Sequence, residues 1–235
     1  MINNKRVLAI ITARGGSKGL PKKNIKLLSG KPLVLWPIKA AKDCKEVDKI
    51  IVSTDSEEIA EVVIKSGIDV PSLRPDYLAS DNAKSSDVIL HILEQSDETF
   101  DYVVMLEPTS PLTEALDISK ALSILDLNRK NADSIVGISA IEATHPEYSV
   151  RQNKKMLEPA FASSFNLLKR RQEIESLYFL EGTLYISDVK TLKLKKSFYH
   201  ERTMGYEVPR WKSFEVDELV DFICIEAIMD HYNLA

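Results

Sequence analysis

The chain has few cysteines and no long apolar run, and both absences restrict where it works. Its two cysteines, Cys44 and Cys224, lie in segments of helical spacing and show no metal-ligand spacing. So few cysteines predict free thiols in a reducing compartment rather than a disulfide framework. No segment is apolar for long enough to cross a membrane, and residues 1–6 lack the features of a signal peptide. We therefore expect a cytoplasmic protein without a membrane partner.

Other functional classes are excluded by further absences. The chain has no excess of positive charge, because 31 Lys and Arg face 35 Asp and Glu, so we expect no nucleic-acid partner. Its four histidines show no ligand spacing, and no nucleophile–base arrangement stands out. The remaining composition, with 44% hydrophobic and 28% charged residues over a length of 235, is ordinary for a globular protein. It predicts a single domain over residues 1–235.

Short apolar runs alternate with segments of helical spacing along most of the chain. Strands are expected at residues 7–11, 49–54, 69–71, 102–106, 134–139 and 182–187, and helices at 33–42, 59–65, 85–98, 118–127 and 219–233. This alternation predicts an α/β fold, a mostly parallel sheet with helices on both faces. Residues 145–180 interrupt it, and this segment is too short to be a second domain. We expect an excursion from the main fold there.

The loop after the first strand, residues 12–24, is rich in glycine and strongly basic. Its glycines let the backbone bend and approach a ligand closely, and its cations are Arg14, Lys18, Lys22 and Lys23. Backbone N–H groups and converging cations favour a polyanion such as a triphosphate, although a solvated basic loop is the ordinary alternative. The loop matches neither the G-x-x-x-x-G-K-[ST] nor the G-x-G-x-x-G motif. The phosphate site therefore belongs to a different class.

The string A-R-G-G-S-K-G-L-P-K-K-N, residues 13–24, resembles the signature of the acylneuraminate cytidylyltransferase family. Further matches follow in chain order, so the resemblance covers nearly the whole chain. It implies an enzyme of cell-surface glycan biosynthesis that couples CTP to a 2-keto-3-deoxy sugar acid of the sialic type and releases pyrophosphate. It also implies a Rossmann-like nucleotidyltransferase domain and a homodimer, in which residues 145–180 form a dimerisation arm that completes the partner's sugar site.

The resemblance assigns roles to two motifs. Catalysis would rest on Arg14, Lys18, Lys23 and Asp217. The nucleotide would be bound by Ala13, Arg14, Gly15, Ser17 and Asn24, together with Arg74, Ala83 and Ser85 of the motif R-P-x-x-L-A-x-D-x-A-x-S. The guanidinium of Arg74 can donate to the base carbonyl, and Asn24 can pair with a base edge. The ordinary alternative is a loop closed by an Arg74–Asp81 ion pair, with Ser85 as a helix N-cap.

The motif E-P-T-S-P-L, which begins at Glu107, matches the family's Q-P-T-S-P-L with Glu in place of the Gln that contacts the acceptor sugar. Phe179 and Glu181 stand where sialic-acid enzymes often carry Arg and Asn. Two sugar-facing positions are thus acidic, which favours an acceptor other than N-acetylneuraminate, such as a diamino, legionaminate-type acid. Arg171 matches an Arg that reaches the neighbouring subunit, unless it is a solvated basic turn. The implied sugar-binding residues are Glu107, Thr109, Ser110, Arg171 and Glu181.

The segment E-V-D-x-x-x-D before the last helix resembles D-I-D-x-x-x-D, whose paired acids bind a divalent metal in the family. Glu215 and Asp217 point the same way on an extended chain, and carboxylates suit Mg²⁺ or Mn²⁺. The expected ligands are Asp217 and either Glu215 or Asp221. The ordinary alternative is a set of acids that stabilise the helix N-terminus.

Two other functions stay open. A 3-deoxy-manno-octulosonate cytidylyltransferase would perform the same chemistry, but that family's loop usually reads differently after the Arg. A non-catalytic CTP-binding or scaffold protein would be expected to lose Arg14 or Asp217, and both are present. Pyrophosphate release with a panel of sugar acids separates these alternatives.

Overall fold

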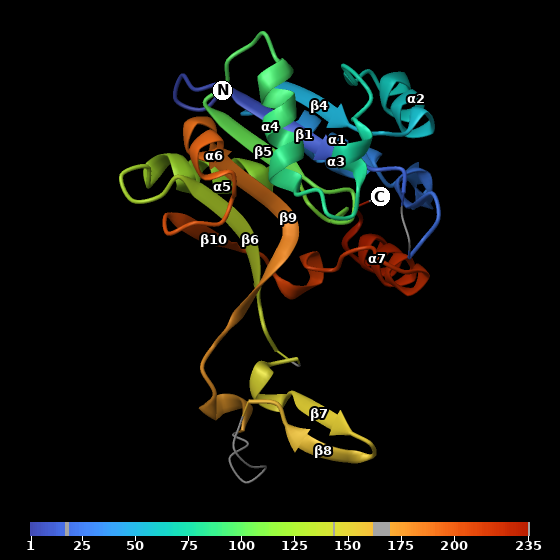
Figure 1. Ribbon diagram of the computed structural model, residues 1–235, viewed down its shortest axis with the longest axis vertical. Helices are drawn as coiled ribbons and strands as arrows, with labels where there is room; N and C mark the ends of the chain where they lie inside the picture. Colours follow the sequence, from blue (N-terminus) through green and yellow to red (C-terminus); the bar gives the residue numbers. More distant parts are fainter. Residues whose placement is uncertain (17–18, 143, 162–169, 235) are drawn as a thin grey trace.

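The computed structural model describes residues 1–16, 19–142, 144–161 and 170–234. Its centre is a six-stranded sheet in the order β10-β6-β9-β5-β1-β4, with β1 Val7–Thr12, β4 Lys49–Ser53, β5 Tyr102–Leu106, β6 Ser134–Ala140, β9 Tyr178–Asp188 and β10 Thr203–Glu207 (Figure 1). β1 pairs in parallel with β4 and β5, and β6 pairs in parallel with β10. β9 is antiparallel to both β5 and β6, so the other strands share one direction. The expected mostly parallel sheet is confirmed.

Helices cover both faces of the sheet, as expected. They are α1 Leu35–Asp43, α2 Glu57–Lys65, α3 Asp76–Ala79, α4 Ser85–Gln95, α5 Ala115–Leu127, α6 Val189–Lys195 and α7 Leu219–Tyr232. Successive side chains of a strand face opposite sides, so Val7, Ala9 and Ile11 of β1 pack under α1, α2 and α5. Leu8 and Ile10 pack under α4 and α6. All five are fully buried, and each large aliphatic side chain among them contributes roughly 1.5–3 kcal/mol.

The structure differs from the sequence prediction at weakly patterned segments. Residues 69–71 form no strand and make only an isolated bridge between Asp69 and Ile51, since Pro71 has no N–H to donate. The prediction missed β10, an edge strand whose sequence T-M-G-Y-E mixes polar residues with glycine. It also missed α6, whose N-cap Asp188 accepts a hydrogen bond from the N–H of Thr191 at 2.9 Å. A short hairpin, β2 Leu27–Leu28 with β3 Lys31–Pro32, went unpredicted too.

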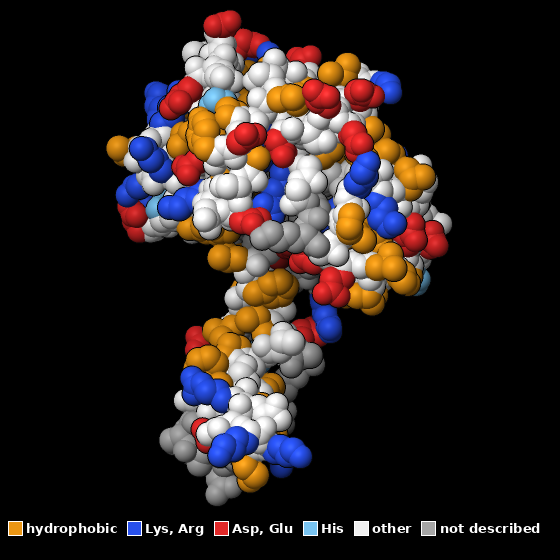
Figure 2. Space-filling model, turned by 45° about the vertical axis from the view of Figure 1, so that its right-hand side comes forward, with side chains coloured by type: hydrophobic (Ala, Val, Ile, Leu, Met, Phe, Trp, Pro, Cys, Tyr) orange, Lys and Arg blue, Asp and Glu red, His pale blue; other side chains and the backbone are white. Residues whose placement is uncertain are grey.

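The expected excursion is an arm that projects from the body of the molecule (Figures 1 and 2). It carries a separate hairpin of β7 Val150–Asn153 and β8 Met156–Pro159, and β9 leads the chain back into the main sheet. At the base of the hairpin, buried His145 contacts the carbonyl of Glu175 through Nε2 at 3.1 Å. Its Nδ1 accepts a hydrogen bond from the N–H of Glu147 at 3.1 Å. The side chains of β7 are exposed.

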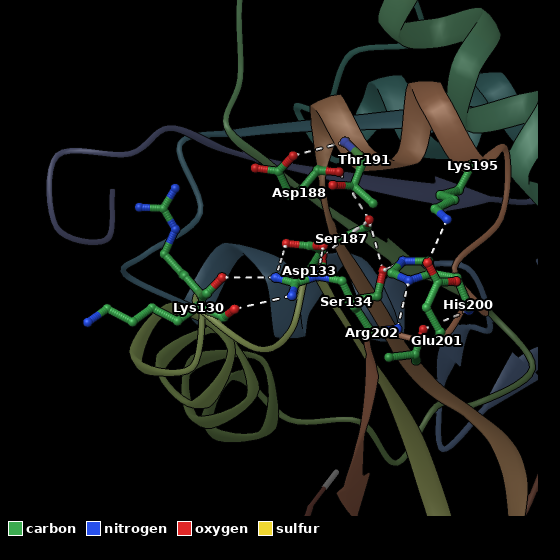
Figure 3. Close-up of polar contacts among 12 residues, drawn as sticks. Lys130, Asp133, Ser134, Ser187, Asp188, Thr191, Lys195, His200, Glu201 and Arg202 are labelled. Atoms are coloured by element: carbon green, nitrogen blue, oxygen red, sulfur yellow. Dashed lines mark hydrogen bonds and ion pairs between the residues drawn. The ribbon is translucent and has the colours of Figure 1, made fainter.

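A polar cluster lies at the other end of the sheet, where β6 begins and β9 ends (Figure 3). Ser134 donates to Ser187 at 2.9 Å, and Nε2 of His200 lies 3.2 Å from the same Ser134 hydroxyl. Nδ1 of His200 accepts the N–H of Arg202 at 3.2 Å, so the proton of the neutral ring is on Nε2. His200 is therefore a donor to Ser134 and cannot act as its base. These hydrogen bonds join the start of β6 to the end of β9.

Candidate active site

A cavity of about 550 Å³ opens at the carboxyl ends of the parallel strands, where ligands of such sheets bind. It brings together all four motifs that the sequence singled out. The predicted residues that line it are Arg14, Lys23, Asn24, Arg74, Ala83, Ser85, Glu107, Thr109, Glu215 and Asp217. Residues 17 and 18, predicted as Ser17 and Lys18 of the phosphate loop, lie outside the described residues, as does the side chain of Arg171.

One wall of the cavity is basic. Nη1 of Arg14 forms an ion pair of 2.8 Å with Oδ1 of Asp81, and both side chains are more than a third exposed. Nζ of Lys23 donates to the carbonyl of Val216 at 2.7 Å and lies 3.3 Å from Oδ1 of Asp217. Lys23 is largely buried, so its ammonium is fixed at the junction of the loop with the acidic segment. An anion in this cavity would meet cations already directed at it.

Two glycines of the basic loop, Gly15 and Gly19, lie where a side chain would collide with neighbouring atoms. A Cβ on Gly15 would lie 2.9 Å from Cβ of Ser56, and the N–H of Gly15 donates to Asp55 at 2.8 Å. A Cβ on Gly19 would lie 2.7 Å from the carbonyl oxygen of Asp217, which is backbone and cannot rotate away. Gly19 thus lets the basic loop touch the acidic segment.

The side chains expected at the cytidine are themselves held by backbone. Buried Asn24 donates through Nδ2 to the carbonyl of Arg14 at 2.8 Å. Arg74 is 8% exposed, and its Nε and Nη2 donate to the hydroxyl and carbonyl of Ser53 at 3.0 and 2.6 Å. Arg74 therefore anchors on the end of β4, whereas Asp81 pairs with Arg14. Burial lowers the pKa of Arg74 from its ordinary value.

The opposite wall is acidic. Burial raises the pKa of Glu107 to about 7, and the charge of Glu215 adds to this rise while Lys23 opposes it. Glu215 accepts the N–H of Gly182 at 2.6 Å, and burial followed by the charge of Asp217 raises its pKa. The acids come from the end of β5 and from the segment before α7, and the N–H of Val216 donates to the carbonyl of Thr109 at 2.8 Å. These carboxylates repel one another when ionised, and a bound cation would reduce that repulsion.

Glu181 and Ser110 lie behind the lining of the cavity rather than on it. Glu181 is 2% exposed, its pKa is raised to about 7 by burial, and Oε2 accepts from the N–H of Thr183 at 3.0 Å. Oε1 occupies the space that a Cβ on Gly137 would need. Among the described residues, this Oε1 and the hydroxyl of Ser110 are buried without a hydrogen-bond partner. The remaining predicted residues outside the lining are Ala13, Gly15 and Asp221.

The acidic residues at the start of α7 have two different roles: one caps the helix, and others line the cavity. Asp221 accepts the N–H groups of Asp217 and Glu218 at 2.8 and 2.7 Å, so its carboxylate caps the helix. Glu215 and Asp217 line the cavity instead. In the described part of the chain, no three His, Cys, Asp or Glu side chains are already grouped around a metal position. The donor set nevertheless fits a hard cation, because carboxylates from one extended segment converge beside a basic phosphate loop.

Sequence reasoning missed several residues that support this site. Ser53 and Asp55 hold Arg74 and Gly15, and the signal for both was their position at the end of a predicted strand. Tyr185 and Tyr199 lie beside the acids, since the charge of Glu107 contributes to the raised pKa of each. Their ring centroids are 6.2 Å apart. No local pattern marks these tyrosines, because Tyr185 lies in β9 and Tyr199 follows α6, and the two meet only in the folded chain.

Comparisons with known proteins agree with this geometry. A cytidylyltransferase family model matches residues 8–232. The chain is 34% identical over 231 residues to a CMP-N,N'-diacetyllegionaminic acid synthase of Legionella pneumophila, covering 96% of this chain and 97% of that protein. It is 34% identical to an N-acylneuraminate cytidylyltransferase of Streptococcus agalactiae, covering 92% of this chain but 51% of that longer protein.

Among solved structures, a CMP:2-keto-3-deoxy-manno-octonic acid synthetase complexed with CTP superposes with a TM-score of 0.71. The match covers 97% of this chain and 99% of that one at 16% identity, and it shows a shared fold. In the described part of the chain, no helix is long and apolar enough to span a membrane. The family match over residues 8–232 confirms the resemblance that the motifs indicate, and this chain belongs to the cytidylyltransferase family.

Proposed function

We propose that this enzyme couples CTP to a nonulosonic acid of the legionaminate type, giving a CMP-sugar and pyrophosphate. The observation that carries the proposal is one cavity in which a basic loop faces partly buried carboxylates at the carboxyl ends of the sheet. The 34% identity to a legionaminic acid synthase over nearly the whole of both chains supports the acceptor class. The reaction requires CTP and a sugar acid, and we place it in the cytoplasm.

In this reaction the anomeric hydroxyl oxygen of the sugar acid attacks the α-phosphorus of CTP. The bond from that phosphorus to the oxygen bridging to the β-phosphate breaks, pyrophosphate leaves, and the hydroxyl proton is released. Negative charge grows on the phosphate oxygens, so catalysis is mainly positioning and electrostatic stabilisation. Arg14, Lys18 and Lys23 would hold the triphosphate together with the loop N–H groups. To do so, Arg14 exchanges its ion pair with Asp81 for a phosphate oxygen.

The nucleoside would lie against Arg74, Asn24, Ala83 and Ser85. Two nitrogens of Arg74 are occupied by Ser53, so its remaining Nη1 is the group we assign to the cytosine carbonyl. The amide nitrogen of Asn24 holds the loop, which leaves its carbonyl oxygen as the acceptor for the base amino group.

Asp217 and Glu215 are the residues we assign to Mg²⁺ or Mn²⁺. A bound divalent ion supplies Lewis-acid polarisation of phosphate oxygens. Asp221 orients the segment by capping α7, and its carboxylate is already engaged by two N–H groups. Lys23 bridges the two halves of the site, since it contacts both Val216 and Asp217.

The acceptor would be recognised by Glu107 and Thr109, with Ser110 and Glu181 behind them and Arg171 contributed by a partner subunit. An ionised carboxylate only accepts hydrogen bonds, so Glu107 favours a group that donates, such as an amide N–H of a diacetamido sugar. A site built around such donors rejects analogues that leave its buried polar groups unpaired. Arg171 would pair with the carboxylate of the sugar acid.

The test is pyrophosphate release from CTP with legionaminate-type, N-acetylneuraminate and octulosonate acceptors. We expect the highest kcat/KM for the legionaminate-type acid, and we expect Glu107→Gln to shift the preference toward N-acetylneuraminate. If N-acetylneuraminate is the best acceptor and Glu107→Gln changes nothing, the acceptor proposal is wrong. If no acceptor releases pyrophosphate while CTP still binds, the chain is a nucleotide-binding protein without this activity.

We also propose that the enzyme is a homodimer built through residues 145–180. The side chains of its strand β7 are exposed, and the hairpin of β7 and β8 projects away from the body of the molecule (Figure 1). A second copy would supply both the missing packing for the arm and the missing cation for the site.

A further inference from the structure

The side chain of Lys212 is a buried cation that lies outside the lining of the active-site cavity. Lys212 is 6% exposed and is not among the residues that line the cavity. Its Nζ forms ion pairs of 2.5 Å with Oε2 of Glu114 and with Oδ2 of Asp117. Taking a charge out of water is costly unless opposite charges pair with it, as these two carboxylates do. The reaction proposed above gives this buried cluster no part.

The two ion pairs join segments that both lead into the site. Lys212 ends the short 3₁₀ helix η5 Arg210–Lys212, and Glu215 follows three positions later. Glu114 is the N-cap residue of α5, and Asp117 lies in the first turn of that helix. The helix begins shortly after the E-P-T-S-P-L motif. Lys212 therefore connects the motif at the end of β5 with the start of the acidic segment.

A second contact joins the same two segments closer to the cavity. The N–H of Val216 donates to the carbonyl of Thr109 at 2.8 Å, and Val216 is fully buried. Lys212 and Val216 thus hold the acidic segment at two points, with Glu215 between them. Consecutive Cα atoms lie only about 3.8 Å apart, so a shift of the anchor at Lys212 displaces the neighbouring carboxylates.

The partners of Lys212 are themselves fixed. Asp117 is buried, its Oδ1 accepts the hydroxyl of Tyr206 on β10 at 3.1 Å, and its Oδ2 accepts the N–H of Glu114 at 2.9 Å. On the other side of η5, Trp211 stacks on Tyr232 near the end of α7, with ring centroids 4.2 Å apart. Lys212 is therefore attached to groups that cannot move freely, and it can hold the segment that follows it.

We propose that Lys212 is a positioning residue: by pairing with Glu114 and Asp117, it sets where the carboxylates of Glu215 and Asp217 lie relative to the basic loop. The inference rests on the metal assignment in the proposed function. Lys212 acts through the backbone of residues 213–217 and touches neither metal nor substrate. Loss of a group that orients metal-binding carboxylates typically lowers metal affinity roughly 10–100-fold.

The test is binding of Mn²⁺ without turnover, measured on the full-length protein by electron paramagnetic resonance in the presence of a CTP analogue. In this analogue a CH₂ group replaces the oxygen between the α- and β-phosphates, so pyrophosphate cannot leave. Lys212→Met places an apolar side chain of similar length at the position and leaves both carboxylates without their cation. We expect the dissociation constant for Mn²⁺ to rise roughly tenfold or more. Turnover with CTP should recover in part as Mg²⁺ is raised.

Lys5→Met is the matched control, because it breaks another largely buried ion pair away from the site. Lys5 precedes β1, at the end of the strand opposite the basic loop, and pairs with Asp126; the two side chains are 17% and 6% exposed. Both Lys5→Met and Lys212→Met should be less stable in urea than the wild type. Only Lys212→Met should also bind Mn²⁺ more weakly, which a merely structural role would not produce.

Glu114→Gln provides a second variant in which folding is not at risk. The side chain of Glu114 is 45% exposed, and its loss leaves Lys212 paired with Asp117. We expect weaker Mn²⁺ binding than in the wild type, by a smaller factor than in Lys212→Met. If Lys212→Met does not fold, Glu114→Gln decides: unchanged Mn²⁺ affinity overturns the positioning role, and weakened binding supports it.

The outcomes separate this inference from the proposed function. If Asp217→Asn abolishes Mn²⁺ binding while Lys212→Met and Glu114→Gln bind Mn²⁺ as tightly as Lys5→Met, the positioning role is wrong and the metal site stands. If the wild type binds no Mn²⁺ with the analogue, both the metal assignment and the positioning role are overturned. Weaker binding in Lys212→Met and Glu114→Gln, but not in Lys5→Met, supports the inference.

Discussion

At the scale of single residues, the site is organised by side chains that hold other groups in place. Arg74 is fixed by Ser53, Asn24 holds the backbone of Arg14, and Lys23 joins the basic loop to the acidic segment. Because of this anchoring, the side chains lose their conformational freedom when the chain folds and not when the reaction occurs. Electrostatic catalysis by preorganised groups requires such fixed side chains. Mutations at these positions therefore separate into those that remove a charge and those that loosen a support.

Arg14→Ala should lower turnover by roughly a hundredfold or more, the typical effect of removing a donor that stabilises transition-state charge. Folding should be unaffected, because the only ion pair that Arg14 forms in the described part of the chain is with half-exposed Asp81. Lys22→Ala is the matched control from the same loop, since Lys22 is exposed and pairs with Glu58 at 2.7 Å. Comparable pyrophosphate release by both variants would contradict the assignment of Arg14 to the triphosphate.

Asp217→Asn should abolish most activity, and the wild-type enzyme should require Mg²⁺ or Mn²⁺. The reason is that Asp217 and Glu215 lie in the acidic segment and line the cavity beside the basic loop. Asp221→Asn should chiefly lower the thermal midpoint, because its carboxylate caps α7. Turnover is measured against metal concentration after chelation. Full activity in EDTA would refute the metal requirement.

Glu107 should give the metal-free protein an unusual pH dependence of stability. Its pKa in the folded state is raised from 4.5 to about 7, so between these values the folded state binds more protons than the unfolded state. The free energy of unfolding therefore falls as pH rises through this window. Glu107→Gln should remove the part of this loss that comes from Glu107, while Glu181 keeps its own part, and the variant should be more stable than the wild type at pH 8 by on the order of 1 kcal/mol.

Urea denaturation of both proteins at pH 5 and pH 8, in the presence of a chelator, measures this difference. Glu158→Gln in the exposed hairpin is the control and should follow the wild type. If Glu107→Gln and the wild type lose the same stability between the two pH values, the carboxyl of Glu107 titrates at its ordinary pKa.

At the scale of elements, the active site depends on two segments touching that are nearly the whole chain apart. The basic loop follows β1 and the acidic segment precedes α7, and Lys23 contacts Val216 across 193 positions of sequence. Gly19 makes this contact close enough, since a Cβ there would collide with the backbone of Asp217. The cap of α7 fixes the acidic segment from its other side.

Gly19→Ala should therefore lower kcat by separating the phosphate loop from the acidic segment, with only a small change in thermal midpoint. Gly16→Ala is the control from the same loop, because a Cβ on Gly16 would meet nothing within 4 Å. Steady-state kinetics of the two variants tests the contact. Equal turnover by Gly19→Ala and the wild type would mean that the loop approaches the acids differently during catalysis.

At the scale of the whole molecule, one chain leaves two surfaces and one site incomplete. The arm and residues Leu219, Val220 and Ile223 of α7 expose apolar side chains. In the described part of the chain, the cations that line the cavity are Arg14, Lys23 and Arg74, which we assign to the nucleotide rather than to the sugar carboxylate. The homodimer proposed above would resolve all three, because each copy would supply what the other lacks.

Mixing two inactive variants tests this sharing of sites. Arg14→Ala damages the chain's own phosphate site, whereas Arg171→Ala should damage only the partner's sugar site. In the mixed dimer, the cavity of the Arg171→Ala chain receives an intact arm, so we expect recovery of up to ~a quarter of wild-type turnover. No recovery from subunits shown to exchange would mean that Arg171 does not act across the interface.

The sequence by itself determined the layout of the fold and the location of the site along the chain. Parallel strands buried on both faces are continuous apolar runs such as residues 7–11, and the basic loop and the R-P and E-P-T-S-P-L motifs are local strings. Local patterns of this kind can be recognised without knowing which helices and strands pack together. They were sufficient for the α/β class, the family and part of the residues that line the cavity.

Only the tertiary structure decided which side chain plays which part. The same acidic string holds Asp221 on the helix cap and Glu215 in the cavity, and Glu181 turns out to lie behind the wall against Gly137. The antiparallel course of β9 and the edge strand β10 were hidden as well, since strand direction and edge pairing are set by contacts with distant strands. Burial and charge depend on neighbours far apart in sequence, and those neighbours meet only in the folded chain.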